Sequence, residues 1–218
     1  MVELLVNNYH INIYELDDNN NTVFHKICEK NDFNNKKLIT YFKEKGVNIN
    51  RVNKDGDSPL ITLSKYTAIS EAVPILLKNG ADINIRNNNG ETALLASCKY
   101  GYYDVSKMLI DCGADVNIPD NEGNTPLLVS CYKERFLHNK DLVEYLIEHG
   151  ADINKANKNG RIPFHEIVYY ANNCLINYFI DHEADINKMD NNGINSLKIA
   201  RSINNEDCIK NLISHGAK

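Results

Sequence analysis

The chain has 218 residues, of which 43% are hydrophobic, and its formal net charge is −5 at pH 7. Because the net charge is negative and Lys and Arg form no dense block, the composition argues against a nucleic-acid partner. No apolar run approaches the roughly 20 residues that a membrane-spanning helix needs, and the first residues are too short and wrongly flanked for a secretory signal. We therefore expect no membrane partner either.

Residues 1–17 are predicted to hold the second helix of an incomplete helical unit, followed by an exit turn. Asn8 stands where later units have a closing glycine, and asparagine is among the few other residues that tolerate the left-handed conformation. The first residues offer little polar outer face, so two explanations stay open. Either the chain was cut from a longer array, or it starts with a minimal cap.

The stretch from Gly90 to Asn117 shows one complete unit of two helices joined by a turn. Thr92 is placed to cap the first helix, and Gly101 is placed to end it. Gly113 stands where a left-handed C-terminal cap belongs. Between the two glycines, apolar residues recur at the spacing of a second helix with one buried face: Val105, Met108 and Leu109.

This unit recurs along the chain. Aligned on the closing position, six copies are spaced 34, 33, 37, 33 and 33 residues apart: Gly46, Gly80, Gly113, Gly150, Glu183 and Gly216. A tag of the form Ala-Asp-hydrophobic-Asn follows that position in most copies. An opening motif precedes the first helix, most clearly as Asp57-Ser58-Pro59-Leu60, Glu91-Thr92-Ala93-Leu94 and Asn124-Thr125-Pro126-Leu127. A period near 33 with these motifs resembles the ankyrin repeat, and the resemblance covers essentially the whole chain.

The resemblance implies an all-α ankyrin-repeat solenoid of about six stacked helix–turn–helix repeats, joined by hairpin-like turns and preceded by a partial N-terminal repeat. The asparagine-rich turns resemble those of ankyrin arrays in poxviruses, gut fungi and intracellular parasites. We expect a single domain over 1–218, divided as follows: a partial repeat or N-terminal cap over 1–17, and repeats over 18–51, 52–85, 86–118, 119–155, 156–188 and 189–218.

Six cysteines raise the question of disulfides or a zinc site. There is no Cys-x-x-Cys pair, and three cysteines fall at one equivalent small-residue position of the first helix: Cys28, Cys98 and Cys131. Cys208 falls at an apolar position of a second helix. The pattern favours small buried hydrophobic residues in a reducing compartment.

The sequence shows no catalytic constellation: it has no phosphate-binding glycine loop, no nucleophile elbow and no paired histidines on one helix turn. Acidic residues are expected in turns and on helix faces, with none placed so that burial shifts its pKa. His149, His182 and His215 recur at predicted helix C-termini, where positive charge is favourable. His25 and His165 match the family's structural histidine. We predict a protein that is not an enzyme and that holds no cofactor and no metal.

In ankyrin proteins the turn tips and the end of the first helix line a concave groove that usually binds a protein. Repeats two to five each place a tyrosine at that helix end, and tyrosine is enriched in binding hot spots. We predict a ladder of these rings across the groove, and packing of the rings against neighbouring repeats is the alternative. The predicted contact residues are Lys65, Tyr66, Arg86, Asn88, Glu91, Lys99, Tyr100, Glu122, Tyr132, Lys133, Tyr169 and Tyr170.

The fourth repeat is longer than its neighbours, and the extra residues are predicted to extend the loop between its two helices. That loop holds Arg135, Phe136 and Leu137. An exposed Phe-Leu pair on a loop is a possible second contact, and packing against the adjacent loop is an equally open alternative.

The sequence thus predicts a monomeric, non-catalytic protein-binding module or adapter that works in the cytoplasm and recognises another protein. Three alternatives stay open. The chain is a regulatory or spacer array of a larger protein, or a viral or parasite factor that interacts with host proteins in the host cytoplasm, or a self-associating structural protein.

Overall fold

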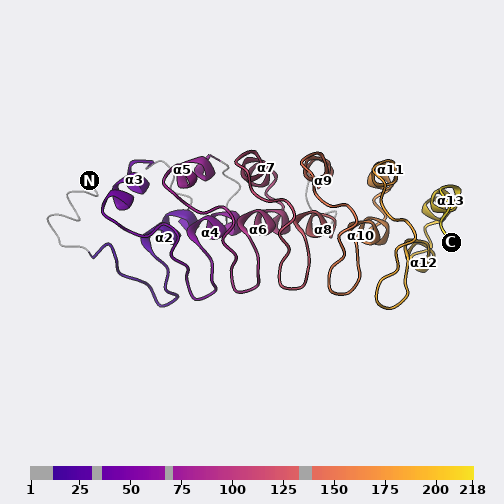
Figure 1. Ribbon diagram of the computed structural model, residues 1–218, viewed down its shortest axis with the longest axis horizontal. Coiled ribbons are helices and arrows are strands. Elements are labelled where there is room, and N and C mark those ends of the chain that lie inside the picture. Colours follow the sequence, from indigo (N-terminus) through magenta and orange to yellow (C-terminus); the bar gives the residue numbers. More distant parts are fainter. Residues whose placement is uncertain (1–11, 31–35, 67–70, 133–138) are drawn as a thin grey trace. The chain divides into compact units, whose positions relative to one another are not determined.

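The computed structural model describes residues 12–30, 36–66, 71–132 and 139–218 (Figure 1). These residues form twelve α-helices and no strand. The helices form successive pairs, and a long turn joins each pair to the next. This arrangement confirms the all-α solenoid of stacked repeats. The chain divides after Asp115 into two compact units. The single domain and its repeat boundaries stay a prediction.

In the first unit, the first helix of each pair is α2 (Val23–Lys30), α4 (Pro59–Tyr66) or α6 (Ala93–Tyr100). The second helix is α3 (Lys36–Glu44), α5 (Ala72–Lys78) or α7 (Tyr103–Asp111). Helix α4 packs on both α2 and α6, and α5 contacts both α3 and α7. The unit therefore has two layers of helices, and its turns project from the first layer, on the side away from the second (Figure 1).

The second unit repeats this arrangement. Its first helices are α8 (Pro126–Ser130), α10 (Pro163–Tyr169) and α12 (Ser196–Ser202). Its second helices are α9 (Asn139–Glu148), α11 (Asn173–Asp181) and α13 (Glu206–Ser214). Helix α10 packs on α8, α11 and α12, and α12 packs on α13, so each pair is held by its neighbour in the unit.

The first helices begin where the opening motif predicts. The Leu95 backbone N–H donates to Thr92 Oγ1 at 3.2 Å, and Thr125 caps α8 in the same way. The prolines Pro59 and Pro126 stand at the first helical position, where a missing N–H costs no hydrogen bond. The side chain of Asn195 caps α12, although the motif there is degenerate.

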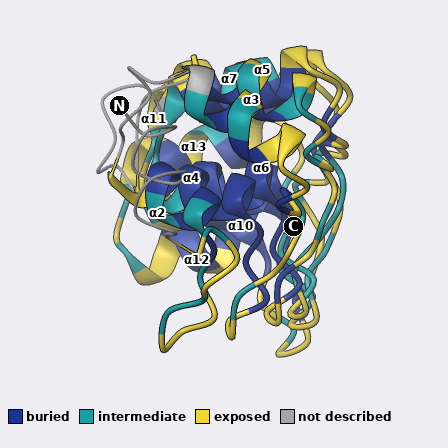
Figure 2. Ribbon diagram, turned by 90° about the vertical axis from the view of Figure 1, so that its left-hand side faces the viewer, coloured by how far each residue is buried: buried dark blue, intermediate teal, exposed yellow. Residues whose placement is uncertain are grey.

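Small buried residues such as Ala96 and Ser97 let α6 pack closely on α4, and α4, α6 and α10 are largely buried (Figure 2). The four cysteines predicted to be small core residues are all buried: Cys28, Cys98, Cys131 and Cys208. Burial raises the pKa of Cys28, Cys131 and Cys208 because the thiolate is poorly solvated there. These thiols are therefore poor nucleophiles, as expected of packing residues. Cys112 and Cys174 are exposed.

Asparagines of the closing tags tie consecutive repeats together. Asn117 Nδ2 donates to the Gly150 carbonyl at 2.9 Å, and Asn117 Oδ1 accepts from the Asp152 N–H at 2.8 Å. One amide side chain thus satisfies a carbonyl and an N–H of the next closing tag. The same pair of bonds, which we call the asparagine clamp, is made by Asn50, Asn154 and Asn187.

The closing position takes up the left-handed conformation, with φ of +86° at Gly150 and +62° at Glu183. A Cβ in this conformation costs on the order of 1–2 kcal/mol. We therefore expect Glu183→Gly to raise the free energy of unfolding by about 1 kcal/mol, as measured by urea denaturation.

Gly150→Glu is the matched control for this prediction, because it makes the reverse change at the equivalent position of the neighbouring repeat. A Cβ on Gly150 would meet nothing within 4 Å, so its cost is backbone strain alone. We expect that variant to lose about what Glu183→Gly gains. A loss of stability in Glu183→Gly would show that the glutamate side chain contributes more than its backbone strain costs.

Candidate functional site

Four of the predicted contact residues of the first unit lie at the ends of two neighbouring helices. Lys65 and Tyr66 are the last two residues of α4, and Lys99 and Tyr100 are the last two of α6. Tyr66 is 61% exposed and Tyr100 is 44% exposed. Ser64, two residues before Tyr66 on α4, is fully buried. Each helix therefore emerges from the core at its tyrosine.

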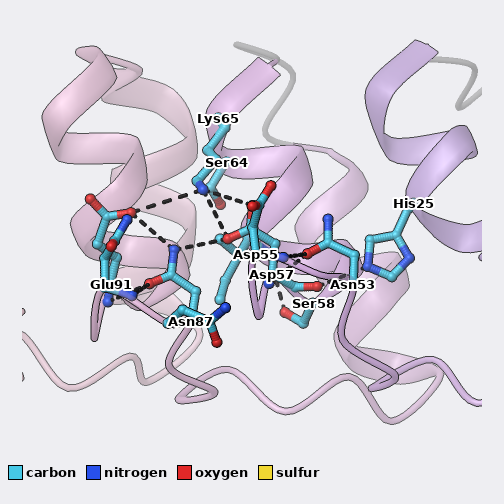
Figure 3. A network of polar contacts seen from close by, with 12 residues as sticks. His25, Asn53, Asp55, Asp57, Ser58, Ser64, Lys65, Asn87 and Glu91 are labelled. Carbon is cyan, nitrogen blue, oxygen red and sulfur yellow. Dashed lines mark hydrogen bonds and ion pairs between the residues drawn. The ribbon is translucent and has the colours of Figure 1, made fainter. Parts of the chain in front are cut away.

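Both lysines pair with acidic residues of the opening turns, and Figure 3 shows Lys65 turned back towards them. Lys65 Nζ lies 2.7 Å from Asp57 Oδ2 and 3.9 Å from Glu91 Oε2. Lys99 Nζ lies 2.6 Å from Glu91 Oε1. The lysines neutralise acidic side chains beneath the helix ends, so their charges are already engaged by the fold.

Glu91 is the centre of this network and is only 3% exposed. Its Oε2 accepts from Asn87 Nδ2 at 3.0 Å, and the same nitrogen donates to Asp57 Oδ1 at 2.8 Å (Figure 3). Burial opposes ionisation of Glu91, but the bonds from Lys99 and Asn87 outweigh it and lower the pKa of the carboxyl. The network thus bridges two successive turns with ionised groups.

The prediction that no acidic residue is placed for burial to shift its pKa was wrong. Glu166 of α10 is buried, and burial raises the pKa of its carboxyl although Arg161 Nε lies 2.5 Å from its Oε1. Glu91 is buried as well. The prediction failed for two reasons: Glu166 lies on α10, which is almost wholly buried, and Glu91 lies in an opening turn that folds back under the first helices.

The turn residues Arg86 and Asn88 hold the turns in shape. Arg86 Nε donates to the Gly90 carbonyl at 3.0 Å. The backbone N–H of Asn88 donates to the Asp55 carbonyl at 3.0 Å, and its Nδ2 donates to the Lys54 carbonyl at 2.9 Å. The Arg86 bond closes its own turn and the Asn88 bonds link successive turns, so a partner would meet a fixed set of turn tips.

In the second unit, the predicted contact residues differ from one repeat to the next. Tyr169, the last residue of α10, is 51% exposed and lies edge-on to Tyr170, with ring centroids 5.1 Å apart. Tyr132 is half-buried, and its hydroxyl donates to Asn124 Oδ1 at 3.0 Å. Burial raises the pKa of Tyr132 to about 12. Glu122 is exposed at a turn tip.

Four predicted contact residues lie outside the described residues: Lys133, Arg135, Phe136 and Leu137. The alignment of all the tyrosines into one ladder stays a prediction. Sequence reasoning overlooked the ion pairs below the tyrosines, although the sequence contains a signal for them. An acidic residue precedes a lysine by eight positions in two successive repeats, as Asp57 and Lys65 and as Glu91 and Lys99.

The family-type histidines have the structural role that the resemblance implies. His25 Nδ1 accepts the Thr22 backbone N–H at 3.1 Å, and its Nε2 lies 2.8 Å from the Asp57 carbonyl of the next repeat. Because a backbone N–H only donates, the ring is neutral and Nε2 carries the proton. His165 Nδ1 likewise accepts the Ile162 N–H, and its Nε2 lies 2.9 Å from the Lys188 carbonyl at the end of the same repeat. Burial lowers the pKa of both rings.

Within the part of the chain that the structure describes, no three His, Cys, Asp or Glu side chains are grouped to hold a metal ion. No helix among the same residues combines the length and the apolar character needed to cross a bilayer.

Comparison with known proteins gives the chain its family. The model for ankyrin repeats in three copies matches residues 1–87, 64–157 and 136–218. An ankyrin repeat protein of Acanthamoeba polyphaga mimivirus is 37% identical over 70 residues, which are 30% of this chain and 43% of that protein. The E3 ubiquitin-protein ligase XBAT33 of Arabidopsis thaliana is 49% identical over 41 residues, 19% of this chain and 8% of that protein. The chain thus matches less than half the length of either relative, and the family match along its whole length shows that it belongs to the ankyrin repeat family.

Proposed function

We propose that this chain is a non-catalytic protein-binding module whose partner contacts the ends of α4 and α6. We call this area the tyrosine surface and define it by Lys65, Tyr66, Lys99 and Tyr100. Ankyrin repeats are generally protein-interaction modules. The observation that carries the proposal is the exposure of two large aromatic rings, Tyr66 and Tyr100, at the ends of two buried, adjacent helices.

The physical properties of the tyrosine surface suit a binding site. A tyrosine ring offers a large contact area and a polar tip, and it has few torsions to immobilise. Tyr100 is stacked on Tyr102, with ring centroids 6.4 Å apart, which restrains its ring before a partner arrives. The ion pairs of Lys65 and Lys99 fix the base of the surface. Little conformational entropy then remains to be lost on association.

The double variant Tyr66→Ala/Tyr100→Ala is expected to weaken partner binding by about 1,000-fold, since each hot-spot residue is worth about 2 kcal/mol, or about 30-fold. Because both rings are exposed, the melting temperature should stay close to that of the wild type. The partner is first captured on the immobilised wild-type chain, and its affinity for each variant is then measured by titration.

Tyr14→Ala is the matched control, because Tyr14 is 59% exposed but lies outside α4 and α6. It should bind the partner like the wild type. Partner binding that survives in the double variant would refute the proposal. A large drop in melting temperature of the double variant would instead favour packing against neighbouring repeats.

The comparisons support two finer versions of the proposal. The match to the plant ligase covers 8% of that protein, which favours a regulatory or spacer array within a longer chain. The mimivirus relatives favour a viral factor that binds host proteins in the host cytoplasm. The boundaries of the full-length gene separate the first version from a stand-alone adapter, and light scattering tests whether the chain is monomeric or self-associates.

A further inference from the structure

A small polar pocket opens in the first unit between the first two opening turns and the helices α2 and α4. It has a volume of about 110 Å³, room for more than one water molecule. Its lining is almost entirely polar and includes Lys26, Glu29, Asp55, Asp57, Thr62 and Tyr66. We call it the turn pocket. Tyr66 belongs to both the pocket and the tyrosine surface.

Thr62 is the first sign that the turn pocket receives a ligand. Its side chain is 5% exposed, and its Oγ1 has no hydrogen-bond partner. Ser64, on the same helix, shows the usual solution, since its hydroxyl donates to the Leu60 carbonyl at 2.9 Å. A buried hydroxyl without a partner costs free energy. A hydrogen-bond donor that enters the pocket would remove that cost.

The charges around the turn pocket favour a cation. Three lining residues are acidic and one, Lys26, is basic. Of the acidic residues, Asp57 is already paired with Lys65 at 2.7 Å. Glu29 and Asp55 remain as the acidic groups for a cation. The Lys26 ammonium is already neutralised, because its Nζ lies 2.7 Å from Asp17 Oδ2 and 3.2 Å from Glu29 Oε2. Glu29 and Asp55 are exposed at the rim. Glu29 also lies in the last turn of α2, where the helix dipole favours positive charge.

The ring of Tyr66 favours arginine over lysine as the cationic side chain that enters the turn pocket. Its ring is largely exposed and lines the pocket. An arginine guanidinium is planar, stacks on aromatic faces and carries five N–H donors, whereas a lysine ammonium is a compact and strongly hydrated point charge. A site with an aromatic face, a hydroxyl and two separate rim carboxylates matches the guanidinium better.

We propose that the turn pocket takes the guanidinium of an arginine side chain of the partner protein, stacked on Tyr66 and donating to the Thr62 hydroxyl and the rim carboxylates. This assignment rests on the proposed function, because the arginine belongs to the protein that covers the tyrosine surface. It makes the pocket the place where partner sequences are distinguished.

The test is a titration of the isotope-labelled chain with N-acetyl-arginine amide, followed by nuclear magnetic resonance. We expect saturable shifts centred on Thr62 and Tyr66, with a Kd of about a millimolar because one side chain makes few contacts. N-acetyl-lysine amide should bind more weakly, and the neutral citrulline analogue should cause no shift at these residues. Equal shifts with citrulline, or no saturation with arginine, would overturn the proposal.

Variants assign the interaction to its residues. Glu29→Gln/Asp55→Asn should weaken binding of the arginine probe about fivefold, as expected for two partly exposed charge pairs. Thr62→Val keeps the side-chain shape and removes the orphan hydroxyl, so it should melt no lower than the wild type yet bind the probe more weakly. Glu44→Gln removes an exposed charge of α3 and is the control that should bind normally. Unchanged binding in the Thr62 and rim variants would contradict the assignment.

The outcomes separate this inference from the proposed function. If the partner no longer binds the tyrosine double variant while the arginine probe fails to bind the wild type, the inference alone is wrong. If the probe binds the pocket while the partner still binds the double variant, the proposed function is wrong and the guanidinium is not that of a partner seated on the tyrosine surface.

Discussion

Replacing His165 by alanine is expected to lower the free energy of unfolding by about 3 kcal/mol, because the change leaves a cavity and two unpaired buried groups. His165 is fully buried. Its ring accepts the Ile162 N–H and reaches the carbonyl of Lys188, the last residue of the same repeat. Ile162 has no side-chain oxygen to cap α10, so the histidine supplies the cap. Urea denaturation of the two proteins gives the difference.

His182→Ala is the control for this variant, because His182 is an exposed histidine at the end of α11. Its Nδ1 bonds the Tyr178 carbonyl at 2.8 Å on the surface. We expect a loss below about 1 kcal/mol there. Equal losses in the two variants would show that the contact of His165 with the Lys188 carbonyl adds nothing to stability.

The pH dependence gives a second readout of the same histidine. Burial lowers the pKa of His25 and His165 below the ordinary value of 6.5, so the unfolded chain binds more protons than the folded chain once the pH falls below 6.5. The histidine contribution to stability is therefore complete above pH 6.5 and is lost as the pH falls towards the folded pKa. His165→Ala should flatten this part of the profile.

Gly56→Ala is expected to destabilise the protein by about 3 kcal/mol or more, which is larger than the cost of backbone strain alone. Gly56 has a φ of +77°, and a Cβ built there would lie 2.6 Å from the backbone nitrogen of Asn88 in the next turn. That nitrogen donates to the Asp55 carbonyl at 3.0 Å. The added methyl group therefore forces two successive turns apart and strains the bond between them.

Gly46→Ala isolates the steric part of this effect. Gly46 has a φ of +81°, and a Cβ there would meet nothing within 4 Å. The substitution is the same and lies in the same unit, so it should cost only the strain of the left-handed backbone, about 1 kcal/mol. Thermal and urea unfolding of both variants tests the difference, and similar losses would mean that the neighbouring turn yields freely.

The fold could be predicted because the same opening motif and closing position recur in successive repeats. The closing position sets where each second helix ends, and Thr92, Thr125 and Asn195 cap the helices where the opening motif places them. The positions of Tyr66 and Tyr100 followed from the same register, since each is the last residue of a first helix.

The side-chain contacts of the site depend on which residues lie nearby in space. The position of a residue within its repeat does not predict those contacts. Lys65 turns to Asp57 and Glu91 because the turns fold back beneath the helix ends. Tyr132 has the same position in its repeat as the other tyrosines, but helix α8 ends earlier, at Ser130. The Tyr132 hydroxyl instead donates a hydrogen bond to Asn124. The orphan hydroxyl of Thr62 gives no sign in the sequence, because threonine on a mainly apolar helix is indistinguishable from an ordinary core residue.

The asparagine clamp has a consequence for how such a chain changes over generations. The clamping side chain binds only main-chain atoms of the repeat that follows it, so the receiving side chains are free to drift. Asn154 makes both bonds even where Glu183 has replaced the glycine, at 3.1 Å to the Glu183 carbonyl and 2.8 Å to the Asp185 N–H. A recombination event that adds or removes a whole repeat therefore recreates this junction without a compensating substitution, and the array is able to lengthen or shorten in single steps.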